Sequence, residues 1–227
     1  MAGVLLAVDA GGTALRMGHA RVALVVAHPD DETLWAGGTL LMHPGWDVFV
    51  AALCRKSDPD RAPKFSRALQ RLRAAGAMGD LDDGPDQDPL PADEVRASVL
   101  SLLARRDFDL LVTHAPWGEY TRHLRHEETS KAVIALWAEG RLRATSLWLF
   151  AYEDGGGTHP PRAETGAPVR FPLPNKAWDE KVAIIQGIYG FGETSWESAA
   201  TPREEAFWAP SSPKQAMMWA DRGSAQP

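Results

Sequence analysis

One short segment constrains this chain more than any other: an apolar run that ends abruptly in a histidine and acidic residues. Residues 22–27 are all apolar, and His28, Asp30, Asp31 and Glu32 follow them. A stretch that is apolar throughout, rather than alternating, predicts a parallel strand covered on both faces. Ligands of open α/β sheets bind just beyond the carboxyl ends of such strands. Charged groups are costly so near a core unless they are paired or bind a metal, so this segment predicts a site.

A second histidine-rich segment follows another apolar run. Residues 109–113 are predicted to form a strand, and residues 114–126 contain three histidines. Parallel strands end at the same edge of a sheet, so we expect the two segments to meet. His28 and Asp31 are three residues apart on a turn, and this spacing lets an imidazole and a carboxylate converge on one ion. Zinc favours these donors, and catalytic zinc sites keep three protein ligands and one open position. The third ligand is expected from the second segment.

The alternation of apolar runs with segments of helical period predicts the fold class. Further strands are expected over residues 47–53 and 146–152, helices over 64–78, 95–103, 127–139 and 176–187, and irregular structure over 80–91 and 155–174. Strands that alternate with helices predict βαβ units. We therefore expect an α/β protein with a Rossmann-like, mostly parallel sheet flanked by helices. The Pro- and Ser-rich stretch from Ala209 is expected to be loose.

Composition limits the classes of function. A chain of 227 residues suits one domain, and a net charge of −6 gives no electrostatic case for nucleic acid or an anionic membrane. The single cysteine, Cys54, excludes an internal disulfide and favours a reducing compartment. No apolar stretch approaches the roughly 18 residues that span a bilayer. The apolar run at residues 4–8 ends at Asp9 and lacks a preceding basic segment, unlike a secretory signal. A cytoplasmic protein is expected, with its oligomeric state left open.

The ordered motifs of the chain resemble those of the LmbE/PIG-L deacetylase family. The sequence His-Pro-Asp-Asp-Glu at residues 28–32, followed by Gly-Gly-Thr-Leu at 37–40, resembles the opening signature of that family. The later matches are Arg67 with Ala74 and Gly79, Thr113-His114, Gly118-Glu119-Tyr120, the pair His123 and His126, and Glu205-Ala206-Phe207. The resemblance covers about residues 21–208, which predicts one domain there, an extension over residues 1–20 and a tail over 209–227.

The resemblance implies a zinc-dependent hydrolase with one Zn²⁺ per chain. Its substrate would be a small molecule carrying an N-acetyl group, usually an N-acetylglucosamine derivative. By position, His28, Asp31 and His126 would bind the metal, and Asp30 would be the general base. His123 would face the scissile carbonyl and, when protonated, help to stabilise the oxyanion. Either Asp30 or His123 would return a proton to the leaving amine. The residues assigned to substrate binding are Arg67, Tyr120 and His114.

Several of these assignments have a plain structural alternative. Arg67 on a helix can be a solvated charge, Tyr120 can belong to a small satellite core, and His114 can be a core hydrogen-bonding group. Where the family commonly has Pro-Asp between its two late histidines, this chain has Leu124-Arg125. Arg125 is expected to bring a positive charge near the site, which leaves the substrate open.

Two other classes of function remain as alternatives. A sugar-binding module without catalytic activity could keep the fold and the metal ligands, although the presence of Asp30 argues against it. Residues 4–18 resemble the phosphate-binding hairpin that opens sugar kinases, where glycines let backbone amides approach phosphate. That match suggests an ATP-dependent sugar kinase, but no second nucleotide motif follows it.

Overall fold

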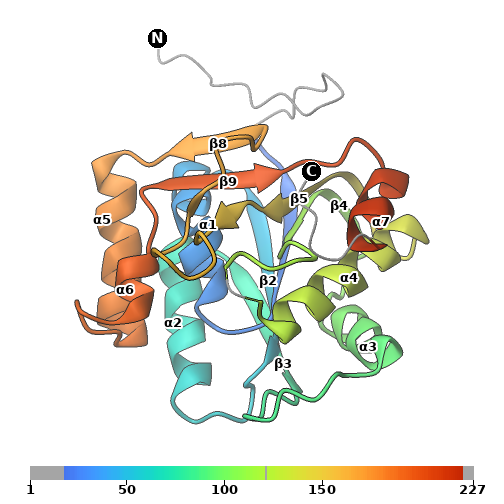
Figure 1. Ribbon diagram of the computed structural model, residues 1–227, viewed down its shortest axis with the longest axis horizontal. Coiled ribbons are helices and arrows are strands. Elements are labelled where there is room, and N and C mark those ends of the chain that lie inside the picture. Colours follow the sequence, from blue (N-terminus) through green and yellow to red (C-terminus); the bar gives the residue numbers. More distant parts are fainter. Residues whose placement is uncertain (1–17, 121, 222–227) are drawn as a thin grey trace.

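The computed structural model describes residues 18–120 and 122–221, which form a seven-stranded sheet with helices on both faces (Figure 1). Five parallel strands, in the order β3-β2-β1-β4-β5, are β1 (Arg21–Val26), β2 (Asp47–Cys54), β3 (Ala75–Leu81), β4 (Asp107–Thr113) and β5 (Arg143–Phe150). Antiparallel strands β9 (Glu204–Trp208) and β8 (Val169–Pro172) extend the sheet beyond β5. Strands β6 (Tyr152–Glu153) and β7 (Arg162–Ala163) pair separately. The predicted fold class is confirmed.

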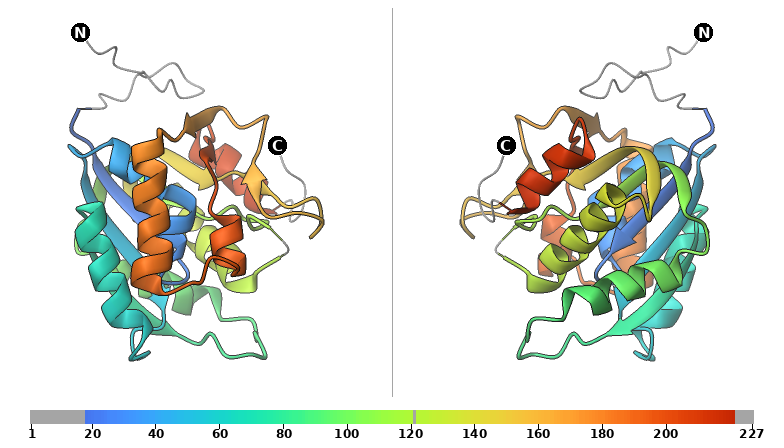
Figure 2. Two further views of the ribbon diagram at one scale, coloured as in Figure 1. Left: turned by 90° about the vertical axis from the view of Figure 1, so that its left-hand side faces the viewer. Right: turned by 90° about the vertical axis from the view of Figure 1, so that its right-hand side faces the viewer.

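The helices divide between the two faces of the sheet, as Figures 1 and 2 show. One face is covered by α1 (Asp31–Met42), α2 (Arg61–Leu72), α5 (Asn175–Ala183) and the π-helical segment η1 (Ile184–Tyr189), with the short α6 (Trp196–Ala200) beside η1. The other face is covered by α3 (Ala92–Leu102), α4 (Leu124–Ala138) and α7 (Pro213–Asp221).

The apolar run of β1 is explained by its central place in the sheet. Val22, Leu24 and Val26 pack into the core beneath α1 and α2, whereas Ala23 and Val25 pack into the core beneath α3 and α4. All five side chains are completely buried. Because both faces of the strand are covered, neither set of alternating positions can be polar.

Two predicted elements differ from the structure. The helix predicted over residues 64–78 is α2 followed by the edge strand β3, because Arg73 takes a left-handed conformation (φ 57°) that ends the helix. The loose tail predicted from Ala209 is wrong as far as Asp221, because α7 buries Ala216 and Trp219 against the α4 side of the sheet. Nearly all of the kinase-like segment, residues 4–18, lies outside the described residues.

The strand order positions the site. The chain proceeds from β1 to β2 and β3 on one side and later to β4 and β5 on the other. The crevice beyond β1 and β4 is therefore the topological switch point, where open α/β sheets bind their ligands. His28 lies two residues after β1, and His114 directly follows β4. The two histidine-rich segments therefore meet, as the sequence predicts.

Candidate metal centre and its cavity

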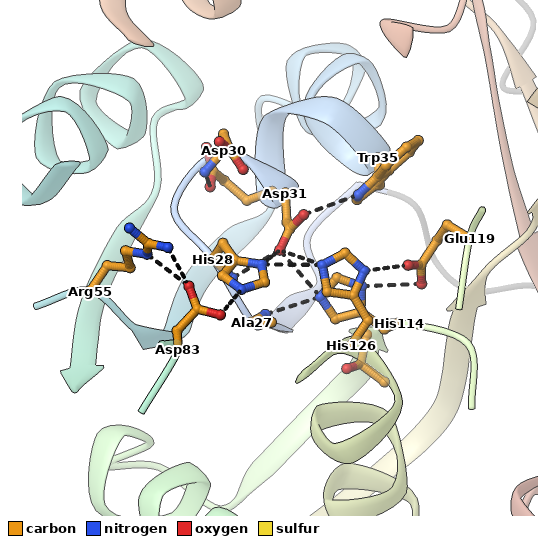
Figure 3. A network of polar contacts seen from close by, with 12 residues as sticks. Ala27, His28, Asp30, Asp31, Trp35, Arg55, Asp83, His114, Glu119 and His126 are labelled. Carbon is orange, nitrogen blue, oxygen red and sulfur yellow. Dashed lines mark hydrogen bonds and ion pairs between the residues drawn. The ribbon is translucent and has the colours of Figure 1, made fainter. Parts of the chain in front are cut away.

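The three predicted metal ligands converge at the switch point (Figure 3). His28 Nδ1 lies 3.2 Å from Asp31 Oδ2 and 3.2 Å from His126 Nε2, and the last two atoms are 3.4 Å apart. His28 comes from the turn after β1, Asp31 is the first residue of α1, and His126 lies in the first turn of α4. Asp31 and His126 are buried, and the His28 side chain is 14% exposed. These three atoms form a nearly equilateral triangle.

This triangle has the dimensions that tetrahedral zinc requires. With zinc–ligand bonds of about 2.0–2.1 Å, neighbouring ligand atoms of a tetrahedral ion lie about 3.3–3.4 Å apart. Two imidazole nitrogens and one carboxylate oxygen are also a donor set typical of catalytic zinc, which leaves a fourth position for water or substrate. The residues therefore fit a zinc ion in both spacing and chemistry.

Further side chains hold the donors in orientation. Glu119 Oε2 lies 2.7 Å from His126 Nδ1, so this ring nitrogen carries the proton and Nε2 is left free as a ligand. Asp83 Oδ1 lies 3.2 Å from His28 Nε2 on the ring edge away from the other donors, and Arg55 holds Asp83 through two hydrogen bonds. Carboxylates that fix the second nitrogen of a histidine in this way are common around metal ions and raise ligand basicity.

The carboxylates make the centre attractive to positive charge. Burial lowers the pKa of His28, but Asp31 and Asp83 outweigh this effect and raise the pKa to about 10. Among the described residues no Lys or Arg contacts Asp31: the His28 amide (2.8 Å) and the Trp35 indole (3.2 Å) donate to it, and its charged partners are imidazoles. Its imidazole neighbours are cations only while they are protonated, and a divalent ion can replace those protons beside the buried carboxylate. The cluster thus suits a divalent ion electrostatically as well as geometrically.

Asp30 lies beside the donor triangle and faces a cavity of about 320 Å³. Its φ of 122° is in a region that a non-glycine residue rarely occupies, and such strain, about 1–3 kcal/mol, is typical of functional sites. Arg61 Nη1 contacts Asp30 Oδ2 at 2.8 Å. Burial and the neighbouring Asp31 raise the pKa of Asp30 well above its usual range, although Arg61 acts in the opposite direction. A carboxylate with a raised pKa is a stronger base than an exposed one.

His123 also lines the cavity. Its ring is stacked against His126, with centroids 4.4 Å apart, and its buried Nδ1 has no hydrogen-bond partner among the described residues. Burial, together with the neighbouring His126 and His28, lowers the pKa of His123 to about 4. The surroundings therefore favour a neutral ring, which differs from the protonated imidazole expected from the sequence.

Only one of the three predicted substrate-binding residues lines the cavity. Tyr120 lines the cavity. His114 does not, because it is fully buried behind His126, with ring centroids 3.9 Å apart, and its Nε2 accepts a hydrogen bond from the Ala27 amide at 3.0 Å. Arg67 is exposed on α2 and does not line the cavity, whereas Arg61, one and a half turns earlier, does. The core interpretation of His114 and the solvated interpretation of Arg67 agree with these positions.

Arg125 does not bring its charge to the cavity, contrary to expectation. The side chain is buried and turns toward the loop after β3, where it donates to the carbonyl oxygens of Asp82 and Asp88. It also pairs with Glu128 at 2.6 Å. Arg125 therefore anchors the loop after β3, and this loop positions Asp83 against His28.

Sequence reasoning missed several residues of the site. Glu119 was visible inside the histidine-rich segment, and a carboxylate among histidines is a signal for an orienting group. Asp83 sits in a loop with many aspartates, and no local pattern distinguishes it from its neighbours. Trp196 lies about 70 residues beyond His126, and its local sequence assigns it no role, so only the fold brings it to the cavity.

With this geometry established, comparison with known proteins identifies the family. Residues 23–137, just over half of the chain, match the PIG-L family, described as GlcNAc-PI de-N-acetylase. The protein belongs to the PIG-L family. A curated relative, the uncharacterized protein L374 of Acanthamoeba polyphaga mimivirus, is 23% identical over 144 residues. That match covers 57% of this chain and 61% of the viral protein, so the chain spans less than two thirds of the relative's length.

Solved structures share the fold at low identity. N,N'-diacetylchitobiose deacetylase from Pyrococcus horikoshii is 16% identical, with a TM-score of 0.64 over 88% of this chain and 86% of that enzyme. GalB, the 4-carboxy-2-hydroxymuconate hydratase of Pseudomonas putida, is 17% identical, with a TM-score of 0.57 over 83% of this chain and 95% of that enzyme. One fold therefore carries both a deacetylase and a hydratase, and the reaction has to be argued from the site. In the described part of this chain, no helix is long and apolar enough to cross a bilayer.

Proposed function

We propose that this PIG-L family member is a metal-dependent hydrolase that removes an N-acetyl group from a neutral amino-sugar-type small molecule. One observation carries the proposal. A donor triangle with zinc-like spacing, His28, Asp31 and His126, lies beside an aspartate, Asp30, that faces the same cavity. Amide hydrolysis needs an activated water and a base to deprotonate it, and this pairing supplies both roles.

His28, Asp31 and His126 would hold the ion. When bound, zinc would supply Lewis-acid polarisation of the amide carbonyl and a water with its pKa lowered toward about 7. Glu119 keeps His126 in the tautomer that presents Nε2, and Asp83 does the equivalent for His28. The ligands are therefore oriented before any substrate binds.

Asp30 would accept the proton of the attacking water. Arg61 contacts one carboxylate oxygen, Oδ2, and so fixes the orientation of the other. Water oxygen then bonds to the carbonyl carbon, the C–N bond breaks, and the amine leaves with a proton while the acyl group leaves as a carboxylate. His123 lines the same cavity, and its neutral imidazole can donate a hydrogen bond to the substrate carbonyl. Asp30 or His123 would carry the proton to the amine.

The charges of the cavity favour an uncharged substrate over a polycarboxylate. The arginines that line it are Arg55 and Arg61, and each is already paired with an aspartate of the same lining, Asp83 and Asp30. Glu197 adds a further negative charge. A substrate with several carboxylates, such as the one named for the structurally similar hydratase, would find no free arginine among the described lining residues. Amide hydrolysis is therefore a better match than hydration of a polyacid.

The decisive experiment measures amine release from N-acetylglucosamine and its glycosides, with and without a chelator. Wild-type protein loaded with Zn²⁺ should release amine, and removal of the metal should abolish it. Asp30→Asn should lower kcat by about 10²–10⁴-fold while bound metal, measured by atomic emission, stays at one ion per chain. Asp93→Asn is the matched control, because that side chain is 97% exposed on α3. Full activity in Asp30→Asn would exclude this residue as the base.

Metal content separates the enzyme from a binding module. His126→Ala should sharply reduce the bound metal, because it removes one of three donors; unchanged occupancy would remove His126 from the ligand set. A wild-type protein that binds zinc and acetylated sugars but releases no amine from any of them would instead be the non-catalytic module.

A further inference from the structure

A tryptophan at the rim of the cavity is exposed without structural need. Trp196 and Met218 are the large apolar side chains of the described chain that stand out in solvent, at 45% and 46% exposure. A single exposed apolar residue is ordinary. Trp196 differs from Met218 because it lines the cavity that contains the donor triangle. Its backbone is fixed, since Ser195 caps the short helix α6 by accepting a hydrogen bond from the Ser198 amide at 3.1 Å.

Trp196 is the outermost ring of an aromatic series that leads into the protein. Its centroid lies 4.8 Å from that of Tyr120, and Tyr120 lies 5.9 Å from Trp35, which is completely buried. Tyr120 and Trp35 also line the cavity. Tyr120 is partly buried by these neighbours, so the rings form one continuous aromatic wall whose outer end remains open to solvent. Aromatic faces of this kind stack on flat groups with exposed C–H or π surface.

Most of the remaining lining is polar, and several of its side chains already form hydrogen bonds with one another. Asp83 accepts hydrogen bonds from Arg55 and from Gln87 Nε2, the latter at 3.0 Å. The cavity volume of about 320 Å³ is at the lower end of the roughly 300–1,000 Å³ that is usual for ligand pockets. It therefore accommodates about one sugar ring near the donor triangle. Any group attached to that sugar has to extend to the rim, where Trp196 is exposed.

We infer that the substrate is an amino sugar that carries a flat apolar group as its aglycone, and that this group stacks on Trp196. The inference rests on the proposed deacylation and specifies its substrate class. A flat apolar face can come from an aromatic ring or from the C–H face of a second sugar. Both present the same chemistry to the indole, and the substrates tested below distinguish them.

The test compares kcat/KM for the methyl and phenyl β-glycosides of N-acetylglucosamine and for N,N'-diacetylchitobiose. The phenyl glycoside, the disaccharide or both should exceed the methyl glycoside by about tenfold, mostly through KM, which is the size of one aromatic stacking contact. Whichever is preferred identifies the source of the flat face. In Trp196→Ala the ratio to the methyl glycoside should fall toward one, and Trp196→Phe should retain most of it. A ratio measured within one protein does not depend on how much of it is folded.

Met218→Ala is the matched control, since it removes an equally exposed apolar side chain on α7 and should leave all rates and ratios as in wild type. The two proposals fail differently. If the wild type releases no amine from any of these compounds, the proposed function is wrong. If it releases amine without preference for a flat aglycone, or if the preference survives in Trp196→Ala, the inference about Trp196 is overturned and the deacylase remains.

Discussion

Two clusters of buried charge contact the same helix, α1, and they are built in opposite ways. In the interior, Lys181 and Glu205 form a closed pair: Nζ and Oε1 are 2.6 Å apart, and both side chains are completely buried. The carboxylate also accepts the amides of Gly38 and Thr39 at 2.8 and 2.6 Å. At the N-terminus of the helix, Asp31 faces imidazoles whose nitrogens converge on one point.

The two clusters show how a buried charge with a structural role can be distinguished from one in a binding site. Lys181 and Glu205 neutralise each other inside the protein and neither side chain reaches solvent, so the pair is not accessible to a ligand. The donor triangle brings three ligand atoms within 3.2–3.4 Å of one another, where protons or a metal cation can bind between them. A buried ion pair that is closed to solvent therefore indicates a structural role. Several metal-ligating atoms that converge beside a cavity indicate a binding site. The predictions below test this contrast.

Lys181→Met should have the largest effect on stability. It leaves the Glu205 carboxylate buried without its cation, and breaking a buried pair in this way costs about 3–5 kcal/mol of unfolding free energy. Burial lowers the pKa of Lys181, and the Glu205 carboxylate counteracts this effect. Chemical denaturation of wild type and variant measures the loss. Zinc affinity of the folded fraction should stay unchanged, because the pair does not contact the donor triangle.

The control for this variant breaks an exposed pair whose carboxylate, Glu180, is next to Lys181 on α5. Arg71→Met breaks the Arg71–Glu180 pair, whose side chains are 52% and 31% exposed, and should cost no more than about 1 kcal/mol. Equal losses in the two variants would mean that burial does not distinguish these pairs, and the contrast between closed and open clusters would lose its basis.

Asp83→Asn should weaken zinc binding by about 10–100-fold, as is usual for a carboxylate that supports a ligating histidine. The asparagine preserves size but holds the His28 Nε2–H less strongly. Competition with a chromophoric chelator gives the affinity. Asp82→Asn is the control, because its side chain is 66% exposed and Arg125 is held by Glu128, by the Asp88 carbonyl and by the Asp82 carbonyl, all of which the change retains. The same affinity in Asp83→Asn as in wild type would show that His28 needs no such support.

The sequence predicts some parts of the fold and site but not others. The strand before His28 and the convergence of two histidine-rich segments could be inferred, because an apolar run and the geometry of parallel strands are local or topological properties. Arg61, Asp83 and Trp196 could not be assigned, because their roles depend on helix rotation, on a clamped loop and on a distant helix. The family motif points to Arg67 and not to Arg61 for a related reason: motif spacing does not determine which side of α2 faces the cavity.

Cys54 tests whether a residue next to the metal site takes part in metal binding, and we expect its effects to be the smallest. It terminates β2, and its amide donates to the Ala27 carbonyl at 3.0 Å, so it lies one strand from His28. Burial and, to a lesser extent, Asp83 raise the pKa of the thiol to about 12. The folded protein should therefore show almost no reaction with a thiol reagent at pH 8, with or without zinc, whereas the unfolded chain should react at its single cysteine.

The raised pKa also fixes the sign of the pH dependence. Since the folded state retains the Cys54 proton longer than the unfolded chain, the contribution of this thiol to stability is fully present below about pH 9. It declines as the pH rises from about 9 toward 12. Cys54→Ala should remove this component from the alkaline stability profile. Rapid labelling at pH 8 that is suppressed by zinc would instead make Cys54 a thiolate ligand. Cys54 would then belong to the metal site together with the donor triangle.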